Sequence, residues 1–588
     1  MPISSRRLSS LVVIALVVVS VFSARPALAN DFVVTSFEDS GPGTLRQAIL
    51  DANASFGPDT ITFSTGGTIN LLSPLPEIIG GDLTIDGTVP SGGTIPQVEL
   101  RGNGTVEGQG LLIKSSNNTI RGFIINGFNA SLTRDKGGAG IVISAVAVAA
   151  ASNNTVEYSY IGTNVAGTDI GFENKPINNF YGGVLLLGGA SDNIVQNNVI
   201  SGNFGPGVSI ERGDFGTSEK IQSGNIIRNN LIGLDATGAN ALANDFSGVS
   251  ISDNSNANII GPGNVISGNG RDSFVPPYGV LIDGSLSDGG YIRDNKVQGN
   301  LIGTDQNGRM SIPNRGGGVQ VSSSENTLIG GPNEADRNII AGNPTAGVTV
   351  ERALDTPSDE VGTVGITIQN NWIGLGANRE PLGNTDVGVL IHRGARGVTV
   401  GPDNLISYNQ RDGVHIKGIE EATPEEQTRD NVISSNRVTN NNADGILISD
   451  GAINNRITGT TTNANGGDGI AFESGGNLDG TVRPLLNNLT LTDTTVSGTL
   501  LNTESCTPDC TIEVFSGFGS DPGEGLIYHT GTTATDTFSV DVPLCRPFLL
   551  FTVTDGSGNT SSFGSQIGPF AQCDAWVVGR AFLPLTIH

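Results

Sequence analysis

A short hydrophobic pattern recurs along most of the chain. The tetrapeptide G-[VI]-x-[IVF] sets two apolar side chains two positions apart, and N-x-[IV]-x-x-N-x-[IV] adds two further short stretches in each repeat. Alternation with period two is typical of β-strands, and Gly and Asn mark the turns between them. Each repeat therefore predicts three short strands and three turns. The tetrapeptide begins at Gly140, Gly207, Gly248, Gly279, Gly318, Gly347, Gly388, Gly413, Gly445 and Gly469, with the variant GVLL at Gly183.

The spacing of these repeats indicates the architecture. Consecutive copies lie 24 to 43 residues apart, and short and long intervals alternate through most of the array. A unit of about 24 residues with three strands fits one rung of a right-handed parallel β-helix, in which rungs stack about 4.8 Å apart. Leucine-rich repeats need a leucine-dominated pattern, and propeller blades are longer. We therefore predict an all-β protein whose residues 103–484 form a parallel β-helix solenoid.

The flanking segments have other patterns. Residues 30–102 predict an N-terminal cap and the first rungs, because TLRQAILDANAS places Leu45, Ala48, Ile49 and Ala52 on one face of a helix that could cover the open end. Residues 485–570 contain longer alternating stretches such as TIEVFSG and TFSVDV, which predict a small β-sandwich. The apolar tail at 571–588 is interpreted as a docking or sorting strand.

The composition is unusual in its amides. The chain has 56 Asn and 84 Gly but only 31 Lys and Arg. Stacked asparagine amides donate to one rung and accept from the next, and Asn tolerates the left-handed conformation of tight corners. We therefore assign two Asn columns to architecture. The first holds Asn179, Asn203, Asn244, Asn314, Asn343, Asn384, Asn409, Asn441 and Asn465, and the second holds Asn198, Asn230, Asn264, Asn300, Asn338, Asn371, Asn404 and Asn436.

Charge and the N-terminus indicate where the protein works. A formal net charge of -26 argues against nucleic acid or an anionic membrane as partner, because phosphate binding needs clustered basic residues. Arg6 and Arg7 precede an apolar run and the sequence Ala27-Leu28-Ala29, so residues 1–29 are predicted to be a signal peptide of a secreted or cell-surface protein. The paired arginines leave twin-arginine export as the alternative to the general route. No later apolar run is long enough for a transmembrane segment.

The four cysteines fit an exported protein. They are Cys506, Cys510, Cys545 and Cys573, all near the C-terminal end. Export favours disulfides, and three pairings are possible. We favour Cys506 with Cys510 and Cys545 with Cys573, and a zinc site is the alternative.

Two segments resemble known proteins. SGPGTLRQAI at 40–49 and DTITF at 59–63 resemble the leading segment of secreted and surface-exposed bacterial β-helix proteins, and the repeats resemble the pectin-lyase-like right-handed β-helix superfamily. TVTDGSGNTSSFG, within 485–570, is similar to immunoglobulin-like modules. The resemblance implies a right-handed β-helix over about residues 31–480. It implies no single activity, because that superfamily includes lyases, hydrolases, epimerases, tailspikes and adhesins.

One column of outward residues carries candidate chemistry. The third and fifth positions of G-V-x-I-x should point away from the core, which would align Glu351, His392 and Lys417 on three consecutive rungs. Enzymes that cleave or epimerise uronates need a cation for the carboxylate and a base for the neighbouring proton. The alternative is an exposed charge ladder in which Glu351 offsets Lys417 across His392. The full candidate set is Glu351, Arg352, His392, Arg393, His415 and Lys417.

Other catalytic schemes find less support. Glu211, Asp283 and Glu351 lie on alternate rungs, about 10 Å apart, which is too wide for paired-carboxylate hydrolysis. The motifs of polygalacturonases and alginate epimerases are missing, and no GGxGxD calcium repeat occurs. We therefore expect no cofactor, and calcium stays open without a motif.

Aromatic residues near the corners of the first half suggest a binding surface. The long units carry insertions that should project as a row on one side. Phe180, Tyr181, Phe204 and Phe246 are the candidate glycan-binding residues, and the alternative is that such aromatics only cover the solenoid. Nearby are Phe172, Phe274 and Tyr278.

Together these features predict a monomeric, secreted or surface-associated protein that binds extracellular polysaccharide or another cell-surface component, or mediates adhesion. The competing hypothesis is a polysaccharide lyase or related carbohydrate-active enzyme. A third hypothesis makes the β-helix a stalk that presents the C-terminal module.

Overall fold

The computed structural model describes most of the chain. The described residues are 29–55, 57–88, 93–129, 138–148, 150–170, 178–213, 220–271, 277–284, 292–352, 363–419, 422–423, 426–477, 485–492, 494–517, 524–542 and 548–568. Residues 1–28 of the predicted signal peptide (1–29), Phe172, Phe274, Cys545, Cys573 and the tail at 571–588 lie outside these ranges.

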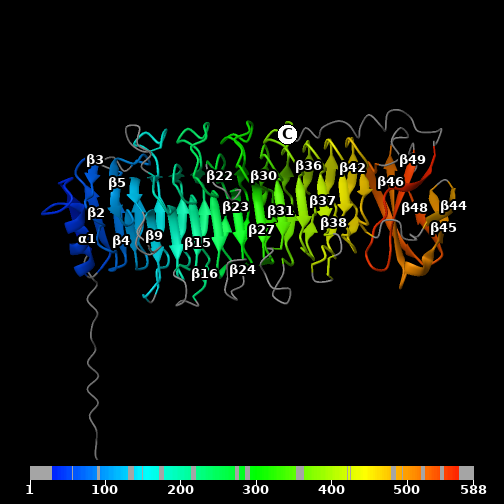
Figure 1. Cartoon of the computed structure of the whole chain (residues 1–588), viewed down its shortest axis with the longest axis horizontal. Helices are drawn as coiled ribbons and strands as arrows, with labels where there is room; N and C mark the ends of the chain where they lie inside the picture. Colours follow the sequence, from blue (N-terminus) through cyan, green and yellow to red (C-terminus); the bar gives the residue numbers. More distant parts are fainter. Residues whose placement is uncertain are drawn as a thin grey trace, which may run out of the picture.

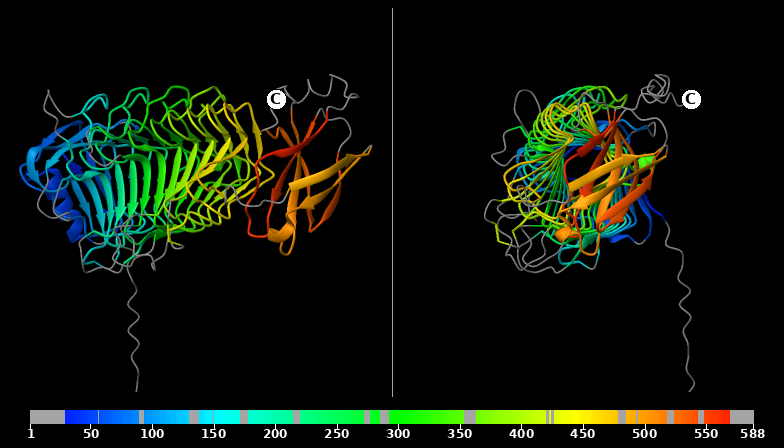
Figure 2. Two further views of the ribbon diagram at one scale, coloured as in Figure 1. Left: turned by 45° about the vertical axis from the view of Figure 1, so that its right-hand side comes forward. Right: turned by 90° about the vertical axis from the view of Figure 1, so that its right-hand side faces the viewer.

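Three long parallel sheets wind along one axis and form the β-helix that the repeats predict (Figures 1 and 2). We number them sheets 1, 2 and 3 in the order in which the chain meets them in each rung. The repeat β10, β11, β12 shows the order, since these strands belong to sheets 1, 2 and 3 in turn.

Sheet 1 consists of β1 (Asp31–Val34), β2 (Asp59–Phe63), β4 (Leu83–Asp86), β7 (Thr119–Arg121), β10 (Thr155–Glu157), β13 (Ile194–Gln196), β17 (Ile226–Arg228), β21 (Ile259–Ile260), β25 (Lys296–Val297), β29 (Leu328–Gly330), β32 (Thr367–Gln369), β35 (Thr399–Val400), β38 (Val432–Ser434) and β41 (Arg456–Thr458). Sheet 2 consists of β3 (Gly67–Asn70), β5 (Val98–Glu107), β8 (Phe123–Asn129), β11 (Tyr160–Ile161), β14 (Val199–Ile200), β18 (Leu231–Ile232), β22 (Val265–Ile266), β26 (Leu301–Ile302), β30 (Ile339–Ile340), β33 (Trp372–Ile373), β36 (Leu405–Ser407), β39 (Arg437–Thr439) and β42 (Thr461–Asn463). Sheet 3 consists of β6 (Leu111–Ile113), β9 (Ala139–Ser144), β12 (Gly182–Leu187), β15 (Val208–Glu211), β19 (Val249–Ser252), β23 (Tyr278–Asp283), β27 (Gly317–Ser322), β31 (Val348–Glu351), β34 (Val389–His392), β37 (Val414–Lys417), β40 (Ile446–Ser449) and β43 (Ile470–Phe472).

Smaller elements lie beside these sheets. Within the described ranges, two pairs of short strands run beside the solenoid, and two single 3-10 turns interrupt the loops. They are β16 (Gln222–Ser223) with β20 (Ser255–Asn256), β24 (Ile292–Arg293) with β28 (Ser324–Glu325), and the turns η2 (Glu334–Asp336) and η3 (Thr503–Ser505).

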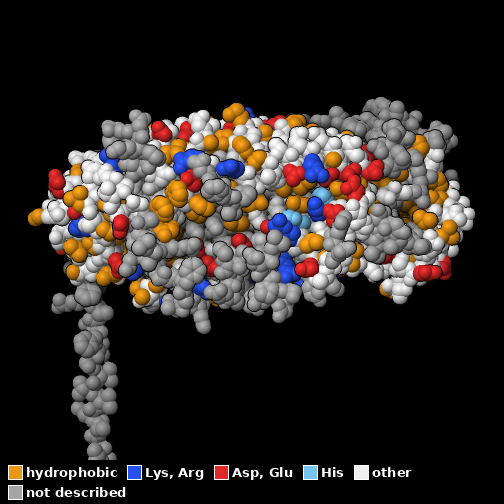
Figure 3. Space-filling model, viewed as in Figure 1, with side chains coloured by type: hydrophobic (Ala, Val, Ile, Leu, Met, Phe, Trp, Pro, Cys, Tyr) orange, Lys and Arg blue, Asp and Glu red, His pale blue; other side chains and the backbone are white. Residues whose placement is uncertain are grey.

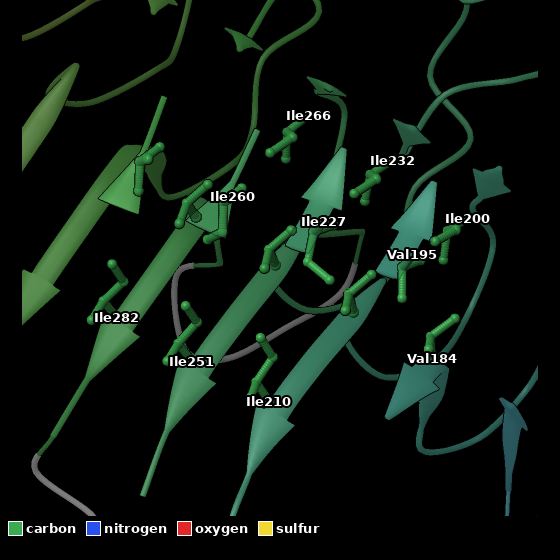
Figure 4. Close-up of a cluster of buried hydrophobic side chains, with 14 of the residues drawn as sticks. Val184, Val195, Ile200, Ile210, Ile227, Ile232, Ile251, Ile260, Ile266 and Ile282 are labelled. Atoms are coloured by element: carbon green, nitrogen blue, oxygen red, sulfur yellow. The ribbon is translucent and has the colours of Figure 1, made fainter. Parts of the chain in front are cut away.

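The core is a set of stacked aliphatic columns. Ile210, Ile251 and Ile282 occupy the same register position on β15, β19 and β23 and are fully buried. Figure 4 shows these side chains facing those of sheets 1 and 2, such as Ile227 and Ile232. Like side chains repeat at the rung spacing, so each Ile packs on the equivalent Ile above and below. These columns are formed by the apolar positions of the repeat identified in the sequence.

The two predicted asparagine columns are continuous ladders of hydrogen bonds. In the corner between sheets 2 and 3, Nδ2 of each Asn donates to Oδ1 of the next at 2.8 to 3.2 Å, from Asn179 through to Asn465. The corner between sheets 1 and 2 is similar from Asn198 to Asn436, at 2.9 to 3.1 Å. Asn269 belongs to the first ladder although the motif N-x-x-x-G-[VI] missed it, because an insertion follows it.

A third ladder occupies the remaining corner, between sheets 3 and 1. It runs through Asn118, Asn154, Asn193, Asn225, Asn258 and Asn295, and begins again at Asn431, Asn455 and Asn477. Its Asn is the first residue of N-x-[IV]-x-x-N-x-[IV], but Thr327, Ile366 and Val398 interrupt the column, so it was not assigned as a ladder from sequence. All three corners of the rung therefore use the same amide chemistry.

The N-terminal end is closed by the predicted helix. Helix α1 (Leu45–Ala54) buries Leu45, Ala48, Ile49 and Ala52, which are the four residues expected on its inner face. Thr44 caps the helix by accepting from the backbone N–H of Gln47 at 3.3 Å. At ten residues, α1 is too short to cross a membrane, and no other helix in the described ranges is long and apolar enough to do so.

The C-terminal module contains two antiparallel sheets. One is formed by β44 (Leu485–Leu491), β45 (Thr495–Leu501) and β48 (Thr537–Asp541), and the other by β46 (Cys510–Gly517), β47 (Ile527–Ala534), β49 (Phe548–Thr554) and β50 (Gly564–Ile567). The favoured disulfide between Cys506 and Cys510 is present. The expected pairing of Cys545 with Cys573 lies outside the described residues.

This module closes the C-terminal end of the solenoid (Figure 2). Phe515, Leu550 and Phe563 join the apolar cluster of the solenoid core rather than that of their own module. Carboxylates of the C-terminal module also accept hydrogen bonds from the last donors of the solenoid corners. Oε1 of Glu524 accepts from the backbone N–H and the amide of Asn465, at 2.7 and 3.0 Å, and Glu513 accepts from Thr458 and Gly459. The module is therefore built onto the last rung.

We predict that Glu524→Ala loosens this end of the protein. The change leaves three donors without their carboxylate, two from Asn465 and the backbone N–H of Ala464, and should lower stability by about 2 to 4 kcal/mol. The expected result is a lower Tm and faster hydrogen exchange in residues 460–477. Glu504→Ala, at an exposed position of the same module, is the control and should change neither. Unchanged exchange in Glu524→Ala would contradict the capping role.

Candidate functional site

The outer face of sheet 3 carries the candidate catalytic residues. Val350, Ile391 and Ile416 point into the core on β31, β34 and β37. Glu351 lies opposite His392 in the parallel register, and Lys417 occupies the next rung. The structure thus brings the three residues onto consecutive strands, as their spacing predicts. Figure 3 shows histidine, basic and acidic side chains gathered over this part of the face.

Glu351 is the centre of a compact group of polar contacts. Its Oε2 lies 2.9 Å from Nε2 of His392 and accepts from Nη1 of Arg393 at 2.7 Å, and its Oε1 accepts from the amide of Gln320. The residue is only 8% exposed. Burial raises the pKa of Glu351, but the contact with His392 and the positive charge of Arg393 outweigh it, so the pKa is lowered. The carboxylate is therefore ionised and held by three side chains.

Lys417 does not take part in that group. Its Nζ lies 3.6 Å from Oδ2 of Asp450, and half of its side chain is exposed. The expected charge ladder in which Glu351 offsets Lys417 across His392 is therefore wrong. Glu351 is already neutralised by Arg393, and the turn after β40 supplies a nearer carboxylate for Lys417.

Arg352 directly follows Glu351, at the end of β31, and its charge also reaches the loop after β37. The pKa of the exposed Glu426 is lowered by hydrogen bonds from Thr423 and, to a smaller extent, by the positive charge of Arg352. The positive charge of Arg352 therefore acts on the loop after β37.

His415 lies on the same face but is buried. It is 8% exposed, its Nε2 is 2.9 Å from Oγ of Ser449, and its Nδ1 is 3.7 Å from Oδ2 of Asp412. Burial, reinforced by the charges of Lys417 and Arg411, lowers the pKa of His415 to about 4. The imidazole is consequently neutral at pH 7.

Tyr278, one of the aromatics expected near the corners, also belongs to this region. It begins β23, and burial together with the negative charge of Glu351 raises its pKa to about 12. The phenol therefore stays protonated at neutral pH.

The four candidate glycan-binding residues come together at the corner before sheet 3. The rings of Phe180 and Phe204 are stacked with centroids 4.8 Å apart, and Phe246 meets Phe204 edge-on at 6.5 Å. Tyr181 packs edge-on against Phe180 at 5.4 Å and lies against the apolar cluster of Leu185 and its neighbours. We call Phe180, Phe204 and Phe246 the aromatic ladder. These three side chains are 37 to 42% exposed.

The long insertions form the expected row along the corner between sheets 2 and 3. They hydrogen-bond to one another directly, since the N–H groups of Ala236, Gln306 and Ala377 donate to the preceding insertion at 2.7 to 2.9 Å. Asp235 and Asp305 order their own loops. Burial opposes their ionisation, but hydrogen bonds from the loop side chains and backbone outweigh it and lower the pKa of both. Their carboxylates are therefore occupied within the loops.

Several residues of this face were not identified from sequence. Gln320 occupies the outward third position of the repeat on β27, in the column that holds His415 three rungs further along, so reading that column as well as the fifth-position one would have included it. Asp412 and Asp450 lie in turns, where no repeat motif marks them. Among the described residues, no group of three or more His, Cys, Asp or Glu side chains is arranged to hold a metal ion.

A family model for the right-handed β-helix region matches residues 109–302 and 278–483. These ranges cover more than half of the 588 residues, so the chain belongs to this family of right-handed parallel β-helix proteins. No curated protein matches the chain.

Solved structures with similar architecture have little sequence in common with this protein. The mannuronan C-5 epimerase A-module of Azotobacter vinelandii is 15% identical, with a TM-score of 0.38, and the match covers 74% of this chain and 96% of that one. A periplasmic alginate epimerase is 11% identical, with a TM-score of 0.39 and coverages of 71% and 76%. A surface adhesin of Streptococcus pneumoniae is 10% identical, with a TM-score of 0.28 and coverages of 89% and 94%.

We predict that His415 makes the fold sensitive to acid. Its pKa is about 4 in the folded protein and about 6.5 when unfolded, so its contribution is complete above pH 6.5 and is lost as the pH falls toward 4. The full effect is about 3 kcal/mol. The drop in Tm between pH 7 and pH 5 should therefore be smaller in His415→Gln than in the wild type.

The comparison isolates His415 from its charged neighbours. Asp412, Lys417, Arg411, Asp450 and His392 all act on the imidazole but are present in both proteins. Equal Tm changes in the two proteins would contradict the assignment.

Proposed function

We propose that this is a secreted or cell-surface protein that binds extracellular polysaccharide along the outer face of sheet 3, with the aromatic ladder as its main contact. One observation carries the proposal. Phe180, Phe204 and Phe246 are the only exposed phenylalanines among the described residues, and they are contiguous on three successive rungs. A contiguous exposed apolar patch marks an interaction site, whereas apolar residues exposed singly are ordinary. The signal sequence read at residues 1–29 supports an extracellular partner.

The ring geometry determines what the ladder can contact. Phe180 and Phe204 stack one face each on the other, and both rings remain partly exposed as a hydrophobic ridge. Phe246 is turned by 66° relative to Phe204, which leaves more of its own face available. Such a ridge suits the C–H surface of a sugar chain laid along the solenoid axis.

Charge favours a neutral polymer at the ladder. The chain carries a formal net charge of -26, which repels polyanions at long range. Beside the ladder, Asp245 is paired with Arg271 at 2.6 Å, so the local charge is largely balanced. We therefore expect neutral glycans to bind more tightly than sulfated or uronate-rich ones at low salt.

We predict that the double variant Phe180→Ala and Phe204→Ala loses most polysaccharide binding. Truncating two exposed contact rings should weaken binding about tenfold to a hundredfold, while the buried core is untouched. Glycan arrays followed by affinity measurement on the best neutral polymer would test it. Tyr528→Ala, which removes a comparably exposed aromatic ring from the C-terminal module, is the control and should bind normally. Undiminished binding by the double variant would refute the ladder as the contact surface.

The alternative function is cleavage or epimerisation of uronates at Glu351, His392 and Lys417. The supporting observation is that the buried Glu351 holds both Arg393 and His392 while Lys417 remains half exposed on the next rung. A cation facing outward can neutralise a substrate carboxylate, and an imidazole oriented by a carboxylate can accept a proton. Glu351, which contacts His392 and Arg393, then positions His392 as the base and does not contact the substrate.

This alternative predicts that purified protein generates unsaturated uronate, or inverts uronate units, on a panel of anionic polysaccharides. His392→Ala and Lys417→Ala should each lower that rate by about a hundredfold or more. Ultraviolet absorbance follows cleavage, and proton NMR follows epimerisation. Activity that survives both substitutions would place the chemistry elsewhere or remove this function.

A further inference from the structure

We propose that Ser449, His415 and Asp412 form a second site on sheet 3, which removes acyl ester groups from the bound polysaccharide. The ester-hydrolysing chemistry stands on the geometry of these three side chains alone. The choice of a polysaccharide as the carrier of the ester rests on the proposed binding function.

The nucleophile and the base are in hydrogen-bond contact. Oγ of Ser449 lies 2.9 Å from Nε2 of His415 and donates to Oδ2 of Asp450 at 3.2 Å, so attack requires the hydroxyl proton to turn toward an unprotonated Nε2. Ser449 ends β40, and His415 lies on the neighbouring strand β37, so the parallel register of sheet 3 fixes the pair. A serine hydroxyl at this distance from an unprotonated imidazole nitrogen is the arrangement from which a base activates a nucleophile.

Asp412 lies on the other side of the imidazole. Its Oδ1 accepts from the backbone N–H of Asp444 at 3.1 Å, which anchors the carboxylate in the turn before β37. Its Oδ2 is buried, makes no hydrogen bond to any described residue, and lies 3.7 Å from Nδ1 of His415. A shift of about 0.5 to 1 Å would complete that hydrogen bond, and such bonds are often long before substrate binds. Asp412 is therefore a positioning residue that selects the tautomer with a proton on Nδ1.

The protonation state of the imidazole fits the role of a base. His415 is neutral at pH 7 because burial lowers its pKa, with Lys417 and Arg411 adding to the effect. Leu390 and Leu447 occupy the register positions on either side of His415, which explains the apolar surroundings. The same leucines provide an apolar border for a small acyl group such as acetyl.

Ser449 differs from the other serines of its column. Ser252 and Ser322 occupy the same outward position on β19 and β27 and are similarly buried, at 6%, 3% and 3% exposure for Ser252, Ser322 and Ser449. Neither Ser252 nor Ser322 contacts a histidine within the described part of the chain. Burial and column position alone therefore do not create the site, and Ser322 is a matched control.

A cation stands where negative charge would develop. Lys417 lies directly opposite Ser449 in the register of β37 and β40, and its half-exposed side chain is held only by Asp450 at 3.6 Å among the ion pairs of the described residues. A positive charge beside the attacking oxygen stabilises the oxyanion of a tetrahedral intermediate.

The reaction balances with water as the only co-reactant. Oγ of Ser449 attacks the ester carbonyl carbon and its proton passes to Nε2 of His415. The bond between that carbon and the sugar oxygen breaks, and His415 returns the proton to the leaving alkoxide, which leaves an acylated Ser449 and a free sugar hydroxyl. Water then attacks the acyl carbon, gives its proton to His415, and releases a carboxylic acid as Ser449 recovers its proton.

A fluorophosphonate, which phosphonylates an activated serine and releases fluoride, tests the nucleophile in the full-length protein. We expect one phosphonyl group per chain, located at Ser449 by peptide mass mapping. Ser449→Ala should abolish labelling, His415→Gln should slow it about a hundredfold or more, and Ser322→Ala should leave it unchanged. No labelling of Ser449, or equal labelling in His415→Gln, would overturn the proposal.

Turnover separates the role of Asp412 from a merely structural one. With p-nitrophenyl acetate, Asp412→Asn should lower kcat about tenfold or more with little change in KM, because the side chain orients the base without contacting substrate. A change confined to KM, or to Tm, would contradict that role.

A last comparison keeps the two functions apart. Ser449→Ala should retain polysaccharide binding, while Phe180→Ala with Phe204→Ala should retain labelling at Ser449. Release of acetate from O-acetylated polysaccharide by the wild type, and its loss in Ser449→Ala, would identify the substrate class. Hydrolysis of p-nitrophenyl acetate without release from any acetylated polymer would overturn the polysaccharide part.

Discussion

The asparagine ladder is the interaction on which the rest of the structure depends. In each corner, one amide donates both to the next amide and to a backbone carbonyl, as Nδ2 of Asn203 does to Oδ1 of Asn244 and to the carbonyl of Ile161. The same Oδ1 of Asn244 also accepts from the backbone N–H of Asn203. These groups are buried, so leaving any of them unpaired would cost about 1 to 3 kcal/mol. The ladder removes that cost only when every rung has the same register. Register is therefore fixed by the corners, and the aliphatic columns of the core follow from it.

A fixed register turns sequence periodicity into surface columns. Residues that are 25 to 41 positions apart in sequence, such as Glu351, His392 and Lys417, become neighbours on adjacent strands. The solenoid can therefore assemble a polar group from side chains of successive rungs without any special loop. The groups around Glu351 and His415 both arise in this way.

The predictable part of the structure is the part that repeats. The solenoid, two of the three ladders, the buried face of α1 and the alignment of Glu351 with His392 all follow from period-two stretches and constant offsets. The third ladder was missed because Thr327, Ile366 and Val398 interrupt its column, although its Asn stands five residues before that of the second ladder, as in Asn193 and Asn198. The partners of Glu351, His415 and Lys417 were missed for another reason: the contacts of Gln320, Asp412 and Asp450 are selected by side-chain reach and burial, which a linear pattern does not contain.

The same ladders explain why the C-terminal module is integral to the solenoid. A ladder is directional, so its last amide always has donors without a following asparagine. Here Asn465 donates to Glu524, the N–H of Gly459 donates to Glu513, and the amide of Asn477 donates to the backbone carbonyl of Thr560. Each acceptor comes from a different strand or loop of the module, and Phe515 with Leu550 completes the apolar closure. A stalk that merely presents a binding domain needs none of these contacts. The module is better understood as the terminal cap that holds the last rungs of sheet 3, and with them Ser449 on β40, in their register.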